Sequence, residues 1–362
     1  MEDLVSDGFW QGRRVFLTGH TGFKGSWLAL WLSRMGAQVT GFALPAEEPS
    51  LFAMAEVADA ITHVEGDIRD LAALEAAMTG AGPEVVFHLA AQPLVRESYV
   101  TPVETFATNV QGTVHLLDAC RRMPSLKAIV CVTSDKCYEN NEWVWPYRES
   151  DPMGGHDPYS ASKGACELVI SAYRRSFFTG DVRLASVRAG NVIGGGDWAK
   201  DRLIPDIVRA LIAGESPLIR SPGSIRPWQH VLEALGGYLL IAARLIEGCD
   251  WAATAWNFGP ADGDVQRVDW IADRMTAKWG TPGWERGNEP GPHEANVLKL
   301  DCARARSLLG WRPALDLATT LDLIVAWHRD VAAGGAAKNI TCSQLDAYRD
   351  KFRAVLAGVS SE

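Results

Sequence analysis

Apolar and polar positions alternate along the first half of the chain in a pattern of short strands separated by helices. Six apolar runs of strand length are bounded by turn residues, and segments of helical periodicity lie between them. Strands that are each followed by a helix favour a parallel sheet covered on both faces. The sequence therefore predicts an α/β fold with a doubly wound parallel sheet, whose strands are expected at residues 13–18, 38–43, 61–64, 85–89, 128–133 and 184–188.

Beyond Gly190 this alternation becomes irregular, and Gly, Pro and Trp become more frequent. We therefore expect a first domain at residues 10–190, to which a strand near 255–260 returns. Residues 191–340 should form a smaller, discontinuous α/β lobe that binds substrate, and residues 341–362 a C-terminal helix. The stretch 139–146 interrupts the pattern directly after the fifth strand, as a long functional loop would.

The first strand runs directly into a glycine-rich turn, after which a helical pattern begins. Strand, Gly-x-x-Gly-x-x-Gly and helix in that order are typical of the dinucleotide-binding turn of a Rossmann-type fold. Glycines allow close backbone approach, and the helix N-terminus attracts a pyrophosphate. We assign the whole turn to the binding of a nicotinamide dinucleotide: Gly19, His20, Thr21, Gly22, Phe23, Lys24 and Gly25.

The acidic residue that usually binds the adenosine ribose is missing. The second strand ends in Phe42-Ala43-Leu44, without an acid for the ribose and without a cation for a 2′-phosphate. This favours NAD over NADP. The next acid in a suitable setting is Asp67, which could accept a hydrogen bond from the adenine amino group. Alternatively, Asp67 is a turn residue that caps the helix expected from Leu71.

Two short segments carry the candidate chemistry. Tyr159 and Lys163 are four residues apart, which places a phenol and an ammonium on one face of a helix. The cation can lower the pKa of the phenol, so that Tyr159 acts as a base toward a hydroxyl group. Ser134-Asp135-Lys136 ends the fifth strand and adds an acid and a second base. Oxidation needs only the first pair, so the second suggests a subsequent elimination.

On the glycine-rich turn, the Tyr159–Lys163 pair and Ser134-Asp135-Lys136, the chain is identified as a member of the extended short-chain dehydrogenase/reductases. Ser-Asp-Lys is similar to the CDP-glucose branch of the sugar-nucleotide 4,6-dehydratases. The resemblance runs from about Trp10 to Trp327, and its main segments are 18–27, 88–96, 133–138, 190–198 and 226–231.

The resemblance implies a reaction in which NAD oxidises C4 of the sugar, water is eliminated across C5 and C6, and hydride returns to C6. Tyr159 would take the O4 proton while Ser134 steadies O4 by a hydrogen bond. Asp135 would protonate the departing C6 hydroxyl. Lys136 would either remove the C5 proton in its neutral form or, as a cation, stabilise the enolate.

The same resemblance extends the binding site. It adds cofactor contacts at Ile68, Leu89, Ala90, Ala91, Gln92 and Thr108. A nucleotide-diphosphate sugar offers phosphates to arginine, and the implied substrate residues are Asn191, Arg202, Arg226 and Asn257. The segment Asn288-Glu289-Pro290-Gly291-Pro292-His293-Glu294 departs from the Arg-Pro-Gly-His-Asp of many relatives.

Composition excludes several other classes. A formal net charge of −9 argues against a nucleic-acid surface. No stretch approaches the ~20 apolar residues of a membrane span, and residues 1–4 lack the features of a signal peptide. The seven scattered cysteines form no metal-ligand pairs, so we expect no metal site and a cytoplasmic location.

The helices expected at 102–121 and 158–177 carry more apolar residues than one core face needs. The resemblance implies that they form a four-helix interface in a homodimer or a dimer of dimers, but the same residues could be ordinary core. Two other functions remain open. A nucleotide-sugar epimerase or oxidoreductase would need only Tyr159 and Lys163, and an NAD-sensing protein without turnover would need neither.

Overall fold

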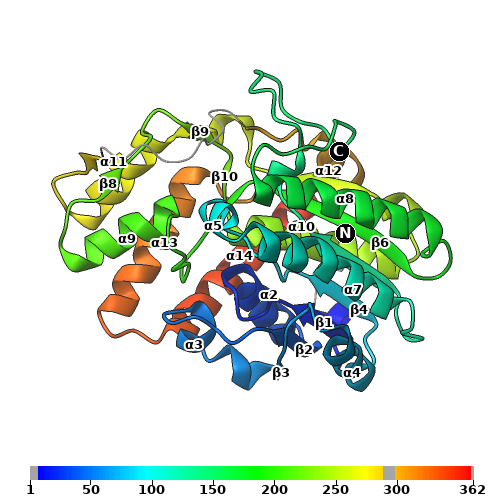
Figure 1. Cartoon of the computed structure of the whole chain (residues 1–362). Helices are drawn as coiled ribbons and strands as arrows, with labels where there is room; N and C mark the ends of the chain where they lie inside the picture. The colour runs from blue at the N-terminus through cyan, green and yellow to red at the C-terminus, as the bar shows by residue number, and fades with distance from the viewer. Residues whose placement is uncertain (1–6, 288–297, 360–362) are drawn as a thin grey trace.

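The computed structural model describes residues 7–287 and 298–359, and its centre is one parallel sheet of seven strands. The strand order is β11-β6-β5-β4-β1-β2-β3 (Figure 1). All six predicted strands and the predicted return strand are confirmed. They are β1 (Arg14–Thr18), β2 (Gln38–Ala43), β3 (Thr62–Glu65), β4 (Val85–His88), β5 (Ala128–Val132), β6 (Arg183–Ala189) and β11 (Ala255–Phe258).

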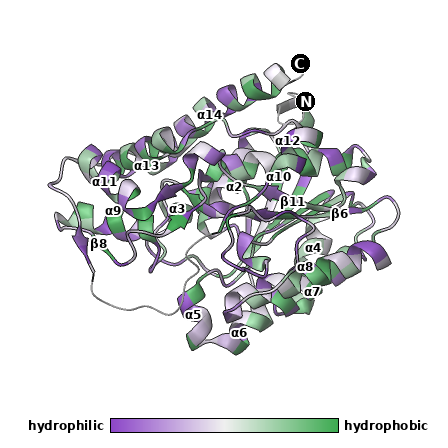
Figure 2. Cartoon of the chain, turned by 90° about the horizontal axis from the view of Figure 1, so that it is seen from above, coloured by the Kyte–Doolittle hydropathy of each residue, from purple (hydrophilic) through white to green (hydrophobic). Residues whose placement is uncertain are grey.

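Helices cover both faces of this sheet, as continuous apolar strands require. Successive side chains of β1 alternate between the two layers: Val15 and Leu17 pack into one core, and Phe16 packs into the other. Seen from above, the two helical layers lie on opposite sides of the strands (Figure 2). One layer contains α2 (Phe23–Arg34), α10 (Val231–Ile246) and α14 (Ala337–Val359), and the other contains α4 (Leu71–Ala81), α7 (Gly112–Cys120) and α8 (Pro158–Ser176).

A smaller lobe has its own apolar core and lies on the left in Figure 1. Its helices are α9 (Leu203–Ala213), α11 (Val268–Trp279) and α13 (Leu317–Ala332). Three two-stranded ladders complete it: β7 (Asn191–Ile193) with β10 (Trp228–His230), β8 (Leu218–Ile219) with β13 (Glu285–Arg286), and β9 (Ile225–Arg226) with β12 (Gln266–Arg267).

Short helices connect these elements. They are α1 (Asp7–Trp10), α3 (Leu51–Met54), α5 (Val95–Val100), α6 (Pro102–Phe106), α12 (Ala303–Leu309), the 3₁₀ turns η2 (Val57–Ala60), η4 (Asp135–Cys137), η5 (Asp250–Ala252) and η6 (Asp262–Asp264), and the π-helical turn η3 (Ala107–Gln111). Within the described ranges, no helix combines the length and apolar character needed to cross a bilayer.

Two helix starts follow from side-chain caps. Asp157 caps α8 by accepting a hydrogen bond from Ser160 N at 2.9 Å, and Pro158 occupies the first turn. At α4 the cap is Asp70, which accepts from Ala73 N at 3.0 Å. The alternative interpretation of Asp67 as the cap of α4 is therefore wrong, because its carboxylate instead pairs with Arg69.

A buried carboxyl group joins α10 to the C-terminal part of the chain. Glu233 accepts hydrogen bonds from Ala314 N at 2.9 Å and Leu315 N at 2.7 Å, and Tyr348 on α14 donates to its other oxygen at 3.0 Å. Burial raises the pKa of Glu233 to about 8, against the opposing effect of these donors. Glu233 thus fixes the C-terminal helix to the sheet layer, while hydrogen bonds from Trp327 Nε1 to Thr341 Oγ1 and from Gln344 Nε2 to the Leu323 carbonyl, each at 2.9 Å, join the same helix to α13 of the smaller lobe.

Glu233 should make stability depend on pH with a defined sign. The folded protein holds a proton that the unfolded chain loses from pH 4.5 upward, so the free energy of unfolding should fall between pH 4.5 and 8. Glu233→Gln keeps the acceptor oxygen and has no proton to lose. Thermal melts across this range should show Tm of the parent falling relative to that of the variant. Parallel Tm curves would contradict a protonated Glu233.

Candidate active site

The predicted glycine turn connects β1 to α2 at the carboxyl edge of the sheet. Gly19 has φ +76° and lies against residues 89–90, where a Cβ atom would come within 2.6 Å of Ala90 N. A Cβ atom at Gly25 would overlap the carbonyl oxygen of Gly19. Gly22 is the N-cap of α2 and makes no side-chain cap bond. This exposed backbone at a helix N-terminus fits the pyrophosphate of a dinucleotide.

His20 has a bulky ring in this narrow turn, and the neighbouring strand makes room for it. The ring packs onto Gly41 of β2, where any Cβ atom would overlap it. Its Nε2 is 2.6 Å from Nδ1 of His63 on β3. Burial, followed by the charge of His63, lowers the pKa of His20 to about 4. The imidazole is thus turned toward β2 and β3, and its role toward the cofactor stays a prediction.

Residues 89–92 are held against the turn by buried polar groups. Leu89 N and Ala90 N each donate to Thr18 Oγ1 at 3.2 Å. Gln92 N donates to Asn109 Oδ1 at 2.8 Å, and Asn109 Nδ2 donates to Ser162 Oγ on α8 at 2.8 Å. Sequence reasoning did not identify Asn109, although its neighbour Thr108 was predicted; both lie in the π-helical turn η3, a geometry frequent at functional sites.

Asp67 and Ile68 follow β3 at the same edge of the sheet. Two hydrogen bonds from the Arg69 guanidinium, at 2.8 and 2.5 Å, hold the pKa of Asp67 below its usual range. Ile68 is buried in the core, while its carbonyl lies 3.1 Å from Nδ1 of His115. Their contacts with adenosine stay predictions.

Tyr159 and Lys163 lie on one face of α8, near its start. Tyr159 N donates to Ser98 Oγ at 3.1 Å, and Lys163 Nζ is 5.9 Å from the centroid of the Tyr159 ring. Burial raises the pKa of Tyr159 to about 12, although a hydrogen bond with Ser134 opposes this rise. Burial also lowers the pKa of Lys163. The lowering of the phenol pKa that the sequence predicted is therefore outweighed by desolvation.

The acid and the second base lie in the 3₁₀ turn η4. Ser134 Oγ accepts from Lys136 N at 3.2 Å and donates to Asp135 Oδ1 at 3.0 Å. Asp135 is only 3% exposed. Burial raises the pKa of Asp135, despite the opposing charges of Lys136 and Arg226. This is the direction that a proton donor requires.

Cationic groups from both lobes gather around this turn. Arg202, at the start of α9, pairs with Asp197 at 3.2 Å. Its charge opposes the rise that burial causes in the pKa of Tyr159. Arg226 on β9 acts on Asp135 in the same way. Burial, and then Arg202 and Lys163, lower the pKa of Lys24 to about 7. Such positive surroundings suit an anionic diphosphate.

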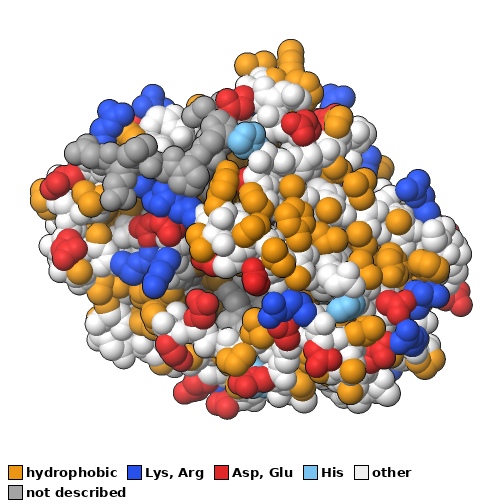
Figure 3. Space-filling model, viewed as in Figure 1, with side chains coloured by type: hydrophobic (Ala, Val, Ile, Leu, Met, Phe, Trp, Pro, Cys, Tyr) orange, Lys and Arg blue, Asp and Glu red, His pale blue; other side chains and the backbone are white. Residues whose placement is uncertain are grey.

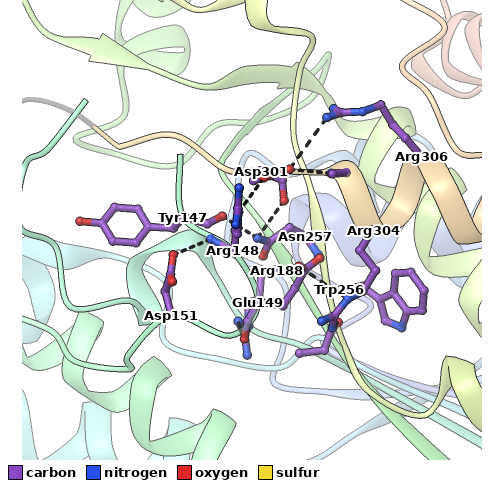
Figure 4. Close-up of polar contacts among 12 residues, drawn as sticks. Tyr147, Arg148, Glu149, Asp151, Arg188, Trp256, Asn257, Asp301, Arg304 and Arg306 are labelled. Carbon is purple, nitrogen blue, oxygen red and sulfur yellow. Dashed lines mark hydrogen bonds and ion pairs between the residues drawn. The ribbon is translucent and has the colours of Figure 1, made fainter. Parts of the chain in front are cut away.

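The four predicted substrate residues do not all belong to this cluster. Asn191 begins β7, directly after Gly190, where a Cβ atom would come within 3.0 Å of Asp135 Oδ2; Arg202 and Arg226 lie as described. Asn257 is fully buried; its Oδ1 accepts from Tyr138 at 2.7 Å, and its Nδ2 donates to the carbonyls of Tyr147 and Asp301 (Figure 4). Because this amide is used by protein partners, we reassign Asn257 to structural support. Residues 288–294 lie outside the described ranges.

A metal site was not expected. In residues 7–287 and 298–359, no three His, Cys, Asp or Glu side chains are grouped so that they could hold an ion.

The closed glycine turn predicts a selective loss of cofactor binding in Gly25→Ala. The added methyl group overlaps the Gly19 carbonyl, so the turn must open, and NAD affinity should fall by about tenfold or more. Gly80→Ala in α4 is a matched control, because its Cβ meets nothing within 4 Å. Calorimetric titration should show parental affinity for Gly80→Ala. Unchanged NAD affinity in Gly25→Ala would contradict the assignment of the turn.

Comparisons with known proteins agree with this site. Residues 15–250 match the model of the NAD dependent epimerase/dehydratase family. The chain is 56% identical to a CDP-glucose 4,6-dehydratase of Salmonella typhimurium, over 90% of this chain and 93% of the relative. It is 30% identical to a dTDP-glucose 4,6-dehydratase of Streptomyces antibioticus, over 75% and 77%.

Solved structures share the fold. A dTDP-glucose 4,6-dehydratase from Streptomyces venezuelae, solved with NAD bound, superposes with a TM-score of 0.77 at 24% identity, covering 89% of this chain and 98% of that one. A UDP-glucose 4-epimerase from Thermotoga maritima gives 0.76 at 22% identity, over 88% and 99%. Glycine turn, Tyr159–Lys163 pair and sequence matches together show that the chain belongs to the NAD-dependent epimerase/dehydratase family.

Proposed function

We propose that the protein is a sugar-nucleotide 4,6-dehydratase that converts CDP-D-glucose into CDP-4-keto-6-deoxy-D-glucose and water. The observation that carries the proposal is the turn η4, in which a buried acid with a raised pKa and a lysine stand beside Tyr159. The 56% identity to the Salmonella enzyme supports the choice of CDP-glucose.

The oxidation half of the reaction belongs to α8. NAD, held at the glycine turn, would accept the C4 hydride and later return it to C6. Tyr159 takes the O4 proton, and Ser134, which is hydrogen-bonded to the Tyr159 phenol, would turn its hydroxyl proton from Asp135 Oδ1 to O4. Burial keeps Tyr159 protonated in the structure, so its phenolate has to form in the occupied site, beside Lys163 and the positive charge of oxidised nicotinamide.

The elimination half belongs to η4. A ketone at C4 acidifies the proton on C5, and Lys136 lies in the same turn as Asp135, where it would accept that proton. Asp135, whose pKa is raised by burial, gives a proton to the C6 hydroxyl, which leaves as water. An epimerase or oxidoreductase needs no such acid at this place, and a binding protein needs neither pair.

Substrate deuterated at C4 tests the whole sequence. The deuterium should appear at C6 of the same sugar, with no net accumulation of NADH. Stoichiometric NADH release, or deuterium returned to C4, would instead indicate an oxidoreductase or an epimerase.

Tyr159→Phe should lower turnover by about 100- to 10,000-fold, as the loss of general base catalysis does, with parental NAD content. A tenfold loss or less would contradict its assigned role.

We infer that the protein forms a homodimer through the outer face of α6, α7 and α8. Hydrophobic side chains gather on this face of the molecule (Figure 3); Val103 of α6 and Leu168 of α8 are 75% and 64% exposed, and Val100, at the end of the neighbouring α5, is 76% exposed. By contrast Leu117 of α7, within the predicted helix 102–121, is fully buried in the protein's own core. An exposed apolar face that extends over adjacent helices favours association with a second copy of the chain.

A charge on this face should separate the subunits. Leu168→Glu buries a carboxylate in the proposed interface, so sedimentation velocity should show a monomer where the parent is a dimer. Leu308→Glu on α12 replaces a leucine of similar exposure, 56%, outside the face and should sediment like the parent. A monomeric parent, or a dimeric Leu168→Glu, would contradict this interface.

A further inference from the structure

Outside the residues that touch substrate or cofactor, one buried ion pair lies directly behind the catalytic turn. Glu167 on α8 and Arg188 on β6 approach to 2.7 Å, with side chains only 5% and 4% exposed. We propose that this pair is a positioning device: it fixes both ends of residues 133–138 to α8, and so sets Asp135 and Lys136 in register with Tyr159 and Lys163. The inference rests on the function proposed above.

The first end of the segment is attached through Thr133. Its Oγ1 donates to Glu167 Oε1 at 2.5 Å, and its backbone N–H donates to the carbonyl of Val187 at 2.9 Å. Thr133 directly precedes Ser134, so this hydrogen bond fixes the point at which the chain leaves β5 and enters η4.

The second end is attached through Tyr138. Arg188 Nη1 donates to the Tyr138 hydroxyl at 2.7 Å, and that hydroxyl donates to Asn257 Oδ1 on β11 at the same distance. The Arg188 guanidinium also lies over the Tyr138 ring, 5.0 Å from its centroid. Tyr138 directly follows η4, so the residues on either side of the acid–base turn depend on one ion pair.

Glu167 connects this anchor to the other half of the chemistry. Tyr159, Lys163 and Glu167 follow one another at intervals of four residues, and therefore lie along one face of α8. Burial alone would raise the pKa of Glu167. The charge and hydrogen bonds of Arg188, with the hydrogen bonds of Thr133 and Ser186, outweigh burial and lower this pKa below its usual value, so the carboxylate stays ionised. Ser186 Oγ supplies one of these bonds at 2.8 Å.

The same anchor extends to the base of the long loop that follows η4. Arg188 Nη1 donates to the carbonyl of Glu149 at 3.2 Å, and the Glu149 carboxylate accepts from Asn257 N at 3.0 Å. Arg304 approaches that carboxylate at 3.7 Å (Figure 4). Segments that are distant in the sequence thus converge behind η4, which explains why Asn257 is buried here rather than exposed to substrate.

The test releases each end of the segment without breaking the ion pair. Thr133→Val and Tyr138→Phe each remove one hydroxyl with little change of shape. In the double variant, formation of the 4-keto-6-deoxy product from CDP-glucose should fall by about 10- to 100-fold, as small displacements of catalytic groups do. Reduced nicotinamide should accumulate on the protein, because Tyr159 and Lys163 remain on α8 and oxidation continues. Exchange of the C5 proton with deuterated solvent should slow in proportion.

Two controls separate positioning from stability. The single variant Thr133→Ser keeps the hydroxyl, and its partitioning between oxidation and elimination should equal that of the parent. Glu233→Ala removes another buried carboxyl group and should lower Tm without any accumulation of reduced nicotinamide. The inference is overturned if the double variant partitions like the parent, or if Glu233→Ala accumulates reduced nicotinamide as well. If the parent itself forms no product from CDP-glucose, the proposed function fails, and this inference falls with it.

Discussion

Desolvation at the carboxyl edge of the sheet is the largest influence on the pKa values of four central groups in the candidate site. It raises the pKa of Asp135 and Tyr159 and lowers that of Lys24 and Lys163, so each of these groups is displaced toward its neutral form. Burial thereby favours the protonated form of Asp135, the form that a proton donor requires. The phenol, in contrast, needs the positive charge of the occupied site before it can act as a base.

An ion pair in such surroundings needs hydrogen-bond partners that offset the desolvation of its two charges. Glu167 and Arg188 satisfy one another and bind Thr133, Ser186 and Tyr138. Removing one partner of a buried pair typically costs about 3–5 kcal/mol, whereas replacing the pair by apolar residues is often neutral. Stability alone is thus a weak reason for a charged pair at this place, and specificity of position is the better one.

Local signals in the sequence predicted much of the fold. Strand ends lie within a residue of those expected, and the Asp157–Pro158 helix start and the glycine turn follow from neighbouring residues. Contacts across the sheet could not be predicted in this way. The Glu167–Arg188 pair and the burial of Asn257 depend on which strands become neighbours, and Asp67 lost the capping role because Asp70 is closer to the helix.

The packing of His20 on Gly41 has an evolutionary consequence. His20 follows β1 and Gly41 lies within β2, yet neither residue can change freely. A side chain at position 41 needs a smaller residue at position 20, and the His20 ring is also paired with His63. The three positions should therefore vary together among homologues. A library that randomises the glycine turn alone would sample sequences that β2 and β3 already forbid, so an altered nucleotide pocket has to be selected across all three segments at once.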